Sequence, residues 1–304
     1  MDLRPVDLPR LREDLIAFIS SPVILHEGSL MPLARVIAKG FREDGLDVAD
    51  PDAHLHHERA TLKNAAMFYV AEDMCYLASQ AAKSLPDFTL LPEDVPSDRG
   101  LVWLAAALTD SDKHGRPFRI AALGWAAEAT RVGVWIYIDR DSVPPEFELR
   151  QLPPIFPFGF WRTPIGDDEV PKRLQHSYAG VEWVAVLKTI WLLMAQDGIA
   201  DMAEAQPDRA TRKHARREGK EPPVIRVITL RCPAGHTAAD GGGREWHHSW
   251  VVRGHWRQAR VGAGRLERRP VWVRPHVKGP ADAPLLGGEK VYEVQAPRQG
   301  ESAA

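Results

Sequence analysis

The first part of the chain has its apolar residues at helical spacing. Between residues 7 and 85 they recur every three or four positions, as at Leu11, Leu15 and Phe18, and again from Met67 to Met74. We expect this pattern to end before Pro86, since a residue that precedes proline avoids the α region. Residues 1–98 are therefore predicted to form a helical N-terminal region.

The middle of the chain has the pattern of an antiparallel sheet. Short apolar runs separated by charged and turn-forming residues predict three strands, at 100–104, 119–125 and 132–138. A meander connects them most simply. Residues 144–171 are rich in proline but also hold Phe156, Phe158, Phe160 and Trp161. So many aromatic side chains indicate a loop packed across the sheet, or alternatively a surface groove, rather than a solvated linker.

A strongly apolar helix follows at residues 178–196, and we expect it to pack on the sheet through Trp191 and its neighbours. A basic helix should begin near Asp208, whose side chain can cap it. Four further strands are predicted at 224–231, 246–260, 270–279 and 290–294.

These elements predict an α+β protein. The helical N-terminal part precedes antiparallel sheet regions in the middle and the C-terminal third, packed on the central apolar helix. The sheet body should span residues 99–296, with a basic β-region from 205, and residues 297–304 should be a disordered tail.

Composition is that of a globular protein. The chain has 304 residues, of which 44% are hydrophobic and 26% charged. No apolar run approaches the length of a membrane span, and the first residues lack the apolar core of a secretory signal. Two cysteines, Cys75 and Cys232, make no disulfide framework. A cytoplasmic location is therefore expected.

Charge is divided unevenly along the chain. Residues 209–278 hold 17 Lys and Arg against 5 Asp and Glu, a net charge of +12, whereas the whole chain has a net charge of −2. Six of the 12 histidines lie in the same segment. The basic helix contributes Arg212 and Arg216. This asymmetry indicates a surface that binds a polyanion such as nucleic acid, or alternatively a basic part that the acidic remainder neutralises within one fold.

Alternation along two C-terminal strands places the basic residues. One face of 250–257 should carry Arg253, His255 and Arg257, and one face of 271–278 should carry Trp272, Arg274, His276 and Lys278. If the two strands form a hairpin, burial of Trp250, Val252, Trp256, Val271 and Val273 should align their apolar faces. Trp191 or its neighbours in the central helix are the best candidates to cover that apolar face. All these basic residues would then share one face, with Trp272 beside them. Like charges kept together in this way suit an anionic partner.

Two histidines among arginines are also residue types that could catalyse RNA cleavage. RNA cleavage without a metal needs a base, an acid and cations around the phosphate, so His255 and His276 are the candidate catalytic pair. Trp272 could stack on a base, or pack inside the protein. No cofactor is implied.

Two other groups of possible metal ligands have weak patterns. Cys232 and His236, with His247 and His248, match no common zinc spacing. The cluster His54, His56, His57 and Glu58 is expected to lie in a solvated loop. No metal site is predicted.

The segment Trp250–Arg257, followed by Val271–Pro280, resembles a set of uncharacterised actinobacterial and actinophage or plasmid proteins. They share a basic Arg-rich helix, a strand like Val227–Arg231, these two strands and a closing strand like Lys290–Tyr292. The resemblance is best over residues 205–295 and looser over 85–139. It implies a cytoplasmic, mobile-element setting and brings no known activity.

The leading hypothesis is nucleic-acid binding, to RNA or DNA, through the basic C-terminal sheet face, with RNA cleavage as an added activity. One alternative is a non-enzymatic interaction module of a mobile element, whose acidic N-terminal half masks that face. Another is a nucleotide-handling enzyme that uses residues 156–161 as a lid. Whether the protein is an enzyme, and its oligomeric state, stay open at this point.

Overall fold

The structure is a computed structural model that describes residues 4–21, 51–111, 117–142, 153–166, 181–231 and 250–278. The chain divides into two compact units. The first comprises Met1–Cys232 together with Trp256–Val271, and the second comprises Pro233–His255 together with Trp272–Ala304. Among the described helices, none combines the length and hydropathy that crossing a bilayer requires.

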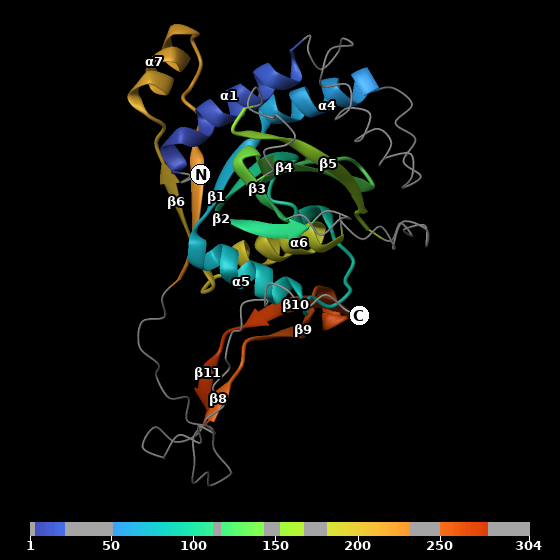
Figure 1. The fold of residues 1–304 in the computed structure, drawn as a ribbon. Helices are drawn as coiled ribbons and strands as arrows, with labels where there is room; N and C mark the ends of the chain where they lie inside the picture. Colours follow the sequence, from blue (N-terminus) through green and yellow to red (C-terminus); the bar gives the residue numbers. More distant parts are fainter. Residues whose placement is uncertain are drawn as a thin grey trace, which may run out of the picture. The chain divides into compact units, whose positions relative to one another are not determined.

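A seven-stranded mixed sheet forms the centre of the first unit, with the strand order β5-β4-β3-β2-β1-β7-β6 (Figure 1). Strand β1 runs parallel to both of its neighbours, β2 and β7, and all other pairs are antiparallel. The strands are β1 (Ala66–Val70), β2 (Arg99–Ser111), β3 (Pro117–Ala127), β4 (Arg131–Asp139), β5 (Ile155–Pro164), β6 (Ala200–Ala205) and β7 (Ile225–Leu230).

Helices cover both faces of this sheet. Helices α1 and α4 lie together against one face, and α5 packs with α6 against the other (Figure 1). Short 3-10 turns lie at Pro5–Asp7, Pro92–Asp94, Arg140–Ser142 and Ala263–Arg265. The α-helices of the described part are α1 (Leu8–Ile19), α4 (Pro51–Asn64), α5 (Glu72–Ala82), α6 (Val181–Met194) and α7 (Arg209–Arg217).

Alternation along β1 divides the core between these two layers. Met67 belongs to the apolar cluster under α1 and α4, together with Leu15, Leu62 and Trp103. Its neighbour Phe68 points to the other side, because successive side chains of a strand face opposite ways. A strand buried on both faces needs apolar residues at consecutive positions, which β1 has.

An aromatic stack holds α6 on the sheet. Trp125 of β3 stacks on Phe68 at 5.5 Å between ring centroids and meets Trp191 of α6 edge-on at 5.3 Å. Gly100, the register partner of Trp125, leaves room for the indole ring, since a Cβ there would overlap it. The prediction that the central helix packs on the sheet is therefore confirmed, but Trp191 meets Trp125 of the meander, whereas the prediction named the C-terminal strands as its partner.

The predicted α+β class is confirmed. The three meander strands are β2, β3 and β4, and the helix at 178–196 is α6. The N-terminal region is not helical throughout, however. Residues 66–70 form β1, a strand inside the sheet, where helical spacing was predicted. The apolar run fits either period because both faces of the strand are buried.

The packed loop predicted within 144–171 is also wrong for its central part. Residues 155–164 form β5, which pairs with β4 along its length. Prolines are compatible with this because β5 is an edge strand, where one side of the backbone needs no ladder partner. Since Phe156 and Trp161 pair with β4 residues, the segment proposed as a lid is a strand of the sheet rather than a loop. The predicted strand at 290–294 and the tail from 297 lie outside the described residues.

Candidate nucleic-acid interface

The basic C-terminal segment folds as two strand pairs rather than one long hairpin. Strand β9 (His255–Val261) pairs with β10 (Glu267–Val273), and β8 (Trp250–Val252) pairs antiparallel with β11 (His276–Lys278). The strands are interrupted at residues 253–254 and 274–275. Proline at 275 cannot donate a ladder hydrogen bond, which explains the second interruption.

Trp272 explains the first interruption. A Cβ at Gly254 would lie 2.6 Å from Cζ2 of Trp272, so the indole ring packs directly over that backbone. The exposed fraction of Trp272 is 9%. Of the two roles left open for Trp272, stacking on a base or packing inside the protein, its burial favours packing.

The predicted single basic face does not form in the β8–β11 pair. His276 is the register partner of Val252, and directly opposite residues of an antiparallel pair project to the same side. The prediction placed Val252 on the apolar face and His276 on the basic one, and this assignment is wrong. The interruptions break the alternation on which it relied. Lys278 pairs through its backbone with Trp250.

Both candidate catalytic histidines sit in the same local arrangement. His255 Nδ1 lies 3.0 Å from the carbonyl oxygen of Arg253, and His276 Nδ1 lies 3.0 Å from that of Arg274. A carbonyl oxygen only accepts, so Nδ1 carries the proton in each neutral ring. This leaves Nε2 as the acceptor, the nitrogen that a general base would use.

The β9–β10 pair displays arginines. Arg257, Arg260 and Arg268 are exposed, and none has a carboxylate partner in the described part of the chain. Arg269 differs, because it donates to Asp94 Oδ1 at 2.5 Å and to Glu93 Oε1 at 2.9 Å. Internal neutralisation thus applies to this arginine, which holds the pair to the acidic turn at 92–94.

Helix α7 is the most concentrated basic element. Five of its nine residues are Lys or Arg, all of them exposed: Arg209, Arg212, Lys213, Arg216 and Arg217. None of the five forms an ion pair with any described carboxylate, whereas His214 lies 3.0 Å from Glu218. As predicted, Asp208 caps the helix, accepting from the Thr211 N–H at 2.7 Å. The two predicted contact residues, Arg212 and Arg216, lie one turn apart and therefore on one face.

A buried acid–base cluster lies under α4, where sequence reasoning expected a solvated loop. Glu58 is 2% exposed, and its burial raises the pKa of the carboxyl to about 8. The fully buried Tyr137 of β4 lies beside it, and burial followed by the charge of Glu58 raises the pKa of that hydroxyl. Neither Glu58 Oε1 nor the Tyr137 hydroxyl has a well-formed hydrogen bond among the described residues.

His54 and His57 complete this cluster. The His54 ring meets Phe160 edge-on at 4.8 Å, and burial, then the charges of His57 and Arg162, lower its pKa to about 4. Burial also lowers the pKa of His57, although Glu128, 4.0 Å away, opposes this. Because Glu58 is closed off from solvent, the cluster suits a proton linked to folding rather than contact with a substrate. The sequence does contain an indication that Glu58 is buried, because at helical spacing it lies on the same face as Leu55 and Leu62.

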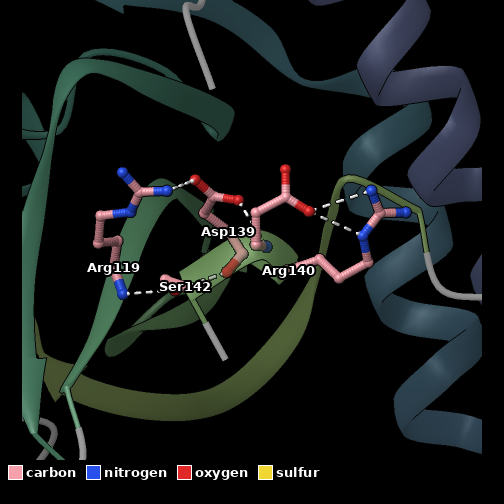
Figure 2. A network of polar contacts seen from close by, with 5 residues as sticks. Arg119, Asp139, Arg140 and Ser142 are labelled. Atoms are coloured by element: carbon pink, nitrogen blue, oxygen red, sulfur yellow. Dashed lines mark hydrogen bonds and ion pairs between the residues drawn. The ribbon is translucent and has the colours of Figure 1, made fainter. Parts of the chain in front are cut away.

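A second polar network closes the end of the meander (Figure 2). Arg119 Nη2 donates to Asp139 Oδ2 at 2.6 Å, and the Arg119 N–H donates to Ser142 Oγ at 2.9 Å. Ser142 in turn donates to the carbonyl oxygen of Asp139. The carboxylate of Asp139 is 3% exposed and also accepts the Asp141 N–H, so its oxygens are engaged in fixing the turn at 140–142.

Other candidate chemistry is absent from the described residues. Burial raises the pKa of the Cys75 thiol to about 11, which makes it a poor nucleophile. Among the described residues, no three His, Cys, Asp or Glu side chains are placed so that they could hold a metal ion together. Cys232, His236, His247 and His248 lie outside the described residues.

No protein-family model matches this chain, and no curated protein matches it. The resemblance to actinobacterial and phage or plasmid proteins stays a prediction.

Proposed function

We propose that this protein binds nucleic acid through helix α7 and the arginines of the β9–β10 pair. The observation that carries the proposal is α7, whose five exposed cations have no carboxylate partner in the described structure. Cations held together without counter-charges repel each other, and phosphates relieve that repulsion. A cytoplasmic location in a mobile-element setting is part of this proposal.

Arginine dominates both elements, which favours phosphate groups as the target. The planar guanidinium presents paired donors to two phosphate oxygens, whereas lysine offers a single charge. Between residues 256 and 271 the chain has five arginines and no lysine. The competing role, internal neutralisation, accounts for Arg269 with Glu93 and Asp94, and for Arg231, which lies 3.3 Å from Asp201. Among the described carboxylates, none accounts for α7 in this way.

The test is the salt dependence of binding to duplex DNA, single-stranded DNA and RNA. Three double variants each remove two exposed cations: Arg212→Gln with Arg216→Gln in α7, Arg257→Gln with Arg260→Gln in β9, and Lys63→Gln with Lys83→Gln as the control outside the basic segment. Each lost phosphate contact should lower the slope of log K against log salt by about 0.7–0.9. Glutamine keeps the helix propensity of α7 close to that of arginine.

We expect the first two variants to bind more weakly with shallower slopes, and the control to match the wild type. Equal slopes for all three variants would refute the interface, and no binding by the wild type at low salt would refute the function itself. Incubation of RNA with the protein in EDTA tests cleavage separately. If cleavage occurs, His255→Ala or His276→Ala should slow it by roughly 10²–10⁴-fold while binding persists.

A further inference from the structure

The tip of the β9–β10 pair presents one bare apolar side chain. Leu266 is 86% exposed, the highest value among the exposed large hydrophobic residues of the described structure. It ends the connection between the two strands, which runs from Gly262 to Leu266. A single exposed leucine is ordinary on a protein surface, so its surroundings decide whether it has a role.

The backbone of this tip is held in an uncommon conformation. Gly262, Gly264 and Arg265 have φ angles of +76°, +68° and +57°, and Arg265 is the one residue other than glycine with a positive φ in the described chain. The Arg265 N–H donates to the Gly262 carbonyl at 3.1 Å, which closes the turn. A non-glycine residue in the left-handed region carries a cost, so the fold retains a strained tip that leaves Leu266 in solvent.

Three arginines flank the leucine, together with the exposed acid Glu267. Arg260 lies on one strand, Arg265 in the turn and Arg268 on the other strand, and all three are exposed without a carboxylate partner in the described residues. The strand pair is held within the same unit at two points, one near the start of β9 and one near the start of β10, three residues after Leu266. Trp256 Nε1 donates to the Ala81 carbonyl at 2.9 Å, and Arg269 pairs with Glu93 and Asp94. A two-stranded ribbon held at both points thus exposes one apolar side chain in its connection, with three arginines and Glu267 beside it.

We infer that this ribbon enters a groove of duplex DNA and that Leu266 wedges between adjacent base pairs, with Arg260, Arg265 and Arg268 on the flanking phosphates. Apolar wedges of this kind partly unstack a base step and kink the duplex, and arginines bind the negative potential of the groove. This inference rests on the proposed function and adds the target and the mode of contact.

An anionic membrane is the competing partner for an apolar tip with cations. One leucine buries far less apolar surface than a fatty acyl chain, which by itself anchors a protein only weakly. One side chain is enough for a wedge at one base step. The guanidinium-rich composition of the ribbon also matches the phosphates that flank a groove.

The experiment uses the full chain and duplex DNA carrying 2-aminopurine, whose fluorescence rises when the base is unstacked. The variant is Leu266→Ser, with Leu266→Met as the conservative rescue. Tyr76→Ser is the matched control, since Tyr76 is an exposed apolar residue (70%) on α5. A donor–acceptor pair on the DNA ends measures the bend in parallel. Vesicles with and without anionic lipid provide the membrane arm.

Wild type, Leu266→Met and Tyr76→Ser should raise the fluorescence and bend the duplex. Leu266→Ser should abolish both signals and weaken duplex binding by about tenfold, while its salt slope stays that of the wild type. Unchanged signals in Leu266→Ser, with duplex still bound, overturn the wedge and leave the proposed function standing. No duplex binding by the wild type overturns the wedge, and the proposed function falls with it only if single-stranded DNA and RNA are not bound either. Leucine-dependent binding to anionic vesicles, without DNA unstacking, assigns the tip to a membrane instead.

Discussion

Replacement of Glu58 by glutamine should remove a large pH dependence of stability. The fold holds this carboxyl away from water beside Tyr137, so its pKa is about 8 rather than 4.5. A raised pKa means that the folded state binds the proton more tightly. The contribution of Glu58 to the free energy of unfolding is therefore fully present below pH 4.5, declines as the pH rises, and is lost above pH 8.

His54 acts in the opposite direction. Its pKa falls from 6.5 to about 4, so its contribution is complete above pH 6.5 and is lost as the pH falls toward 4. Between pH 4.5 and 6.5 the effect of Glu58 on the free energy of unfolding is opposed by those of His54 and His57, whose pKa values are both lowered. Between pH 6.5 and 8 Glu58 acts alone, at about 1.4 kcal/mol per pH unit, which amounts to about 2 kcal/mol over that window.

The quantity to measure is the free energy of unfolding of Glu58→Gln minus that of the wild type, from urea titrations followed by tryptophan fluorescence. All unchanged groups cancel in this difference. It should rise by about 1.4 kcal/mol per pH unit from pH 5 to pH 8, or about 4 kcal/mol in all. Glu182→Gln, which removes an exposed carboxylate of α6, supplies the baseline. A difference that stays constant over this range would show that Glu58 ionises freely in the folded protein.

Two further substitutions test the packing. Gly100→Ala should destabilise the protein by about 1–3 kcal/mol or more, because the new Cβ overlaps Trp125. Gly159→Ala is the control, since its new Cβ meets only Ile136 at an ordinary 3.8 Å. Equal melting temperatures for the two variants would contradict this prediction. Trp256→Phe should lower the free energy of unfolding by about 1 kcal/mol, because the half-buried side chain loses its hydrogen bond to the Ala81 carbonyl. A loss of about 3–5 kcal/mol in a urea titration, typical of a buried tryptophan, would place Trp256 in the core instead.

Trp256 also shows where the sequence prediction named the wrong partner. It was expected to be buried against the central helix, but it reaches Ala81, the next-to-last residue of α5. Its neighbours Val271 and Val273 are likewise only half-buried. Periodicity identifies which side of a strand is apolar, but it does not identify the element that covers that side.

Local signals predicted much of the fold. The meander strands, α6 and the Asp208 cap follow from patterns contained within each segment. Strand β1 was missed because only one residue separates it from helix α4 and one from α5, so no turn residues mark its ends. Its parallel partners, β2 and β7, come from distant segments, and pairing between distant segments leaves no local period.

The basic segment shows why a count of charges does not define an interface. Its register in β8 and β11 depends on two interruptions, and these follow from a tryptophan over Gly254 and a proline at 275. The arginines that make up the net charge of +12 instead have two different roles: some form ion pairs within the protein, and others are exposed. Arg269 is neutralised by Glu93 and Asp94, and this pairing joins β10 to the turn at 92–94 within the first unit. The ion pairs of Arg269 fix the strands that carry Arg257, Arg260 and Arg268, and these three arginines are exposed to solvent. Neutralisation and polyanion binding are therefore not alternatives here, since the first holds in place the residues that we propose for the second.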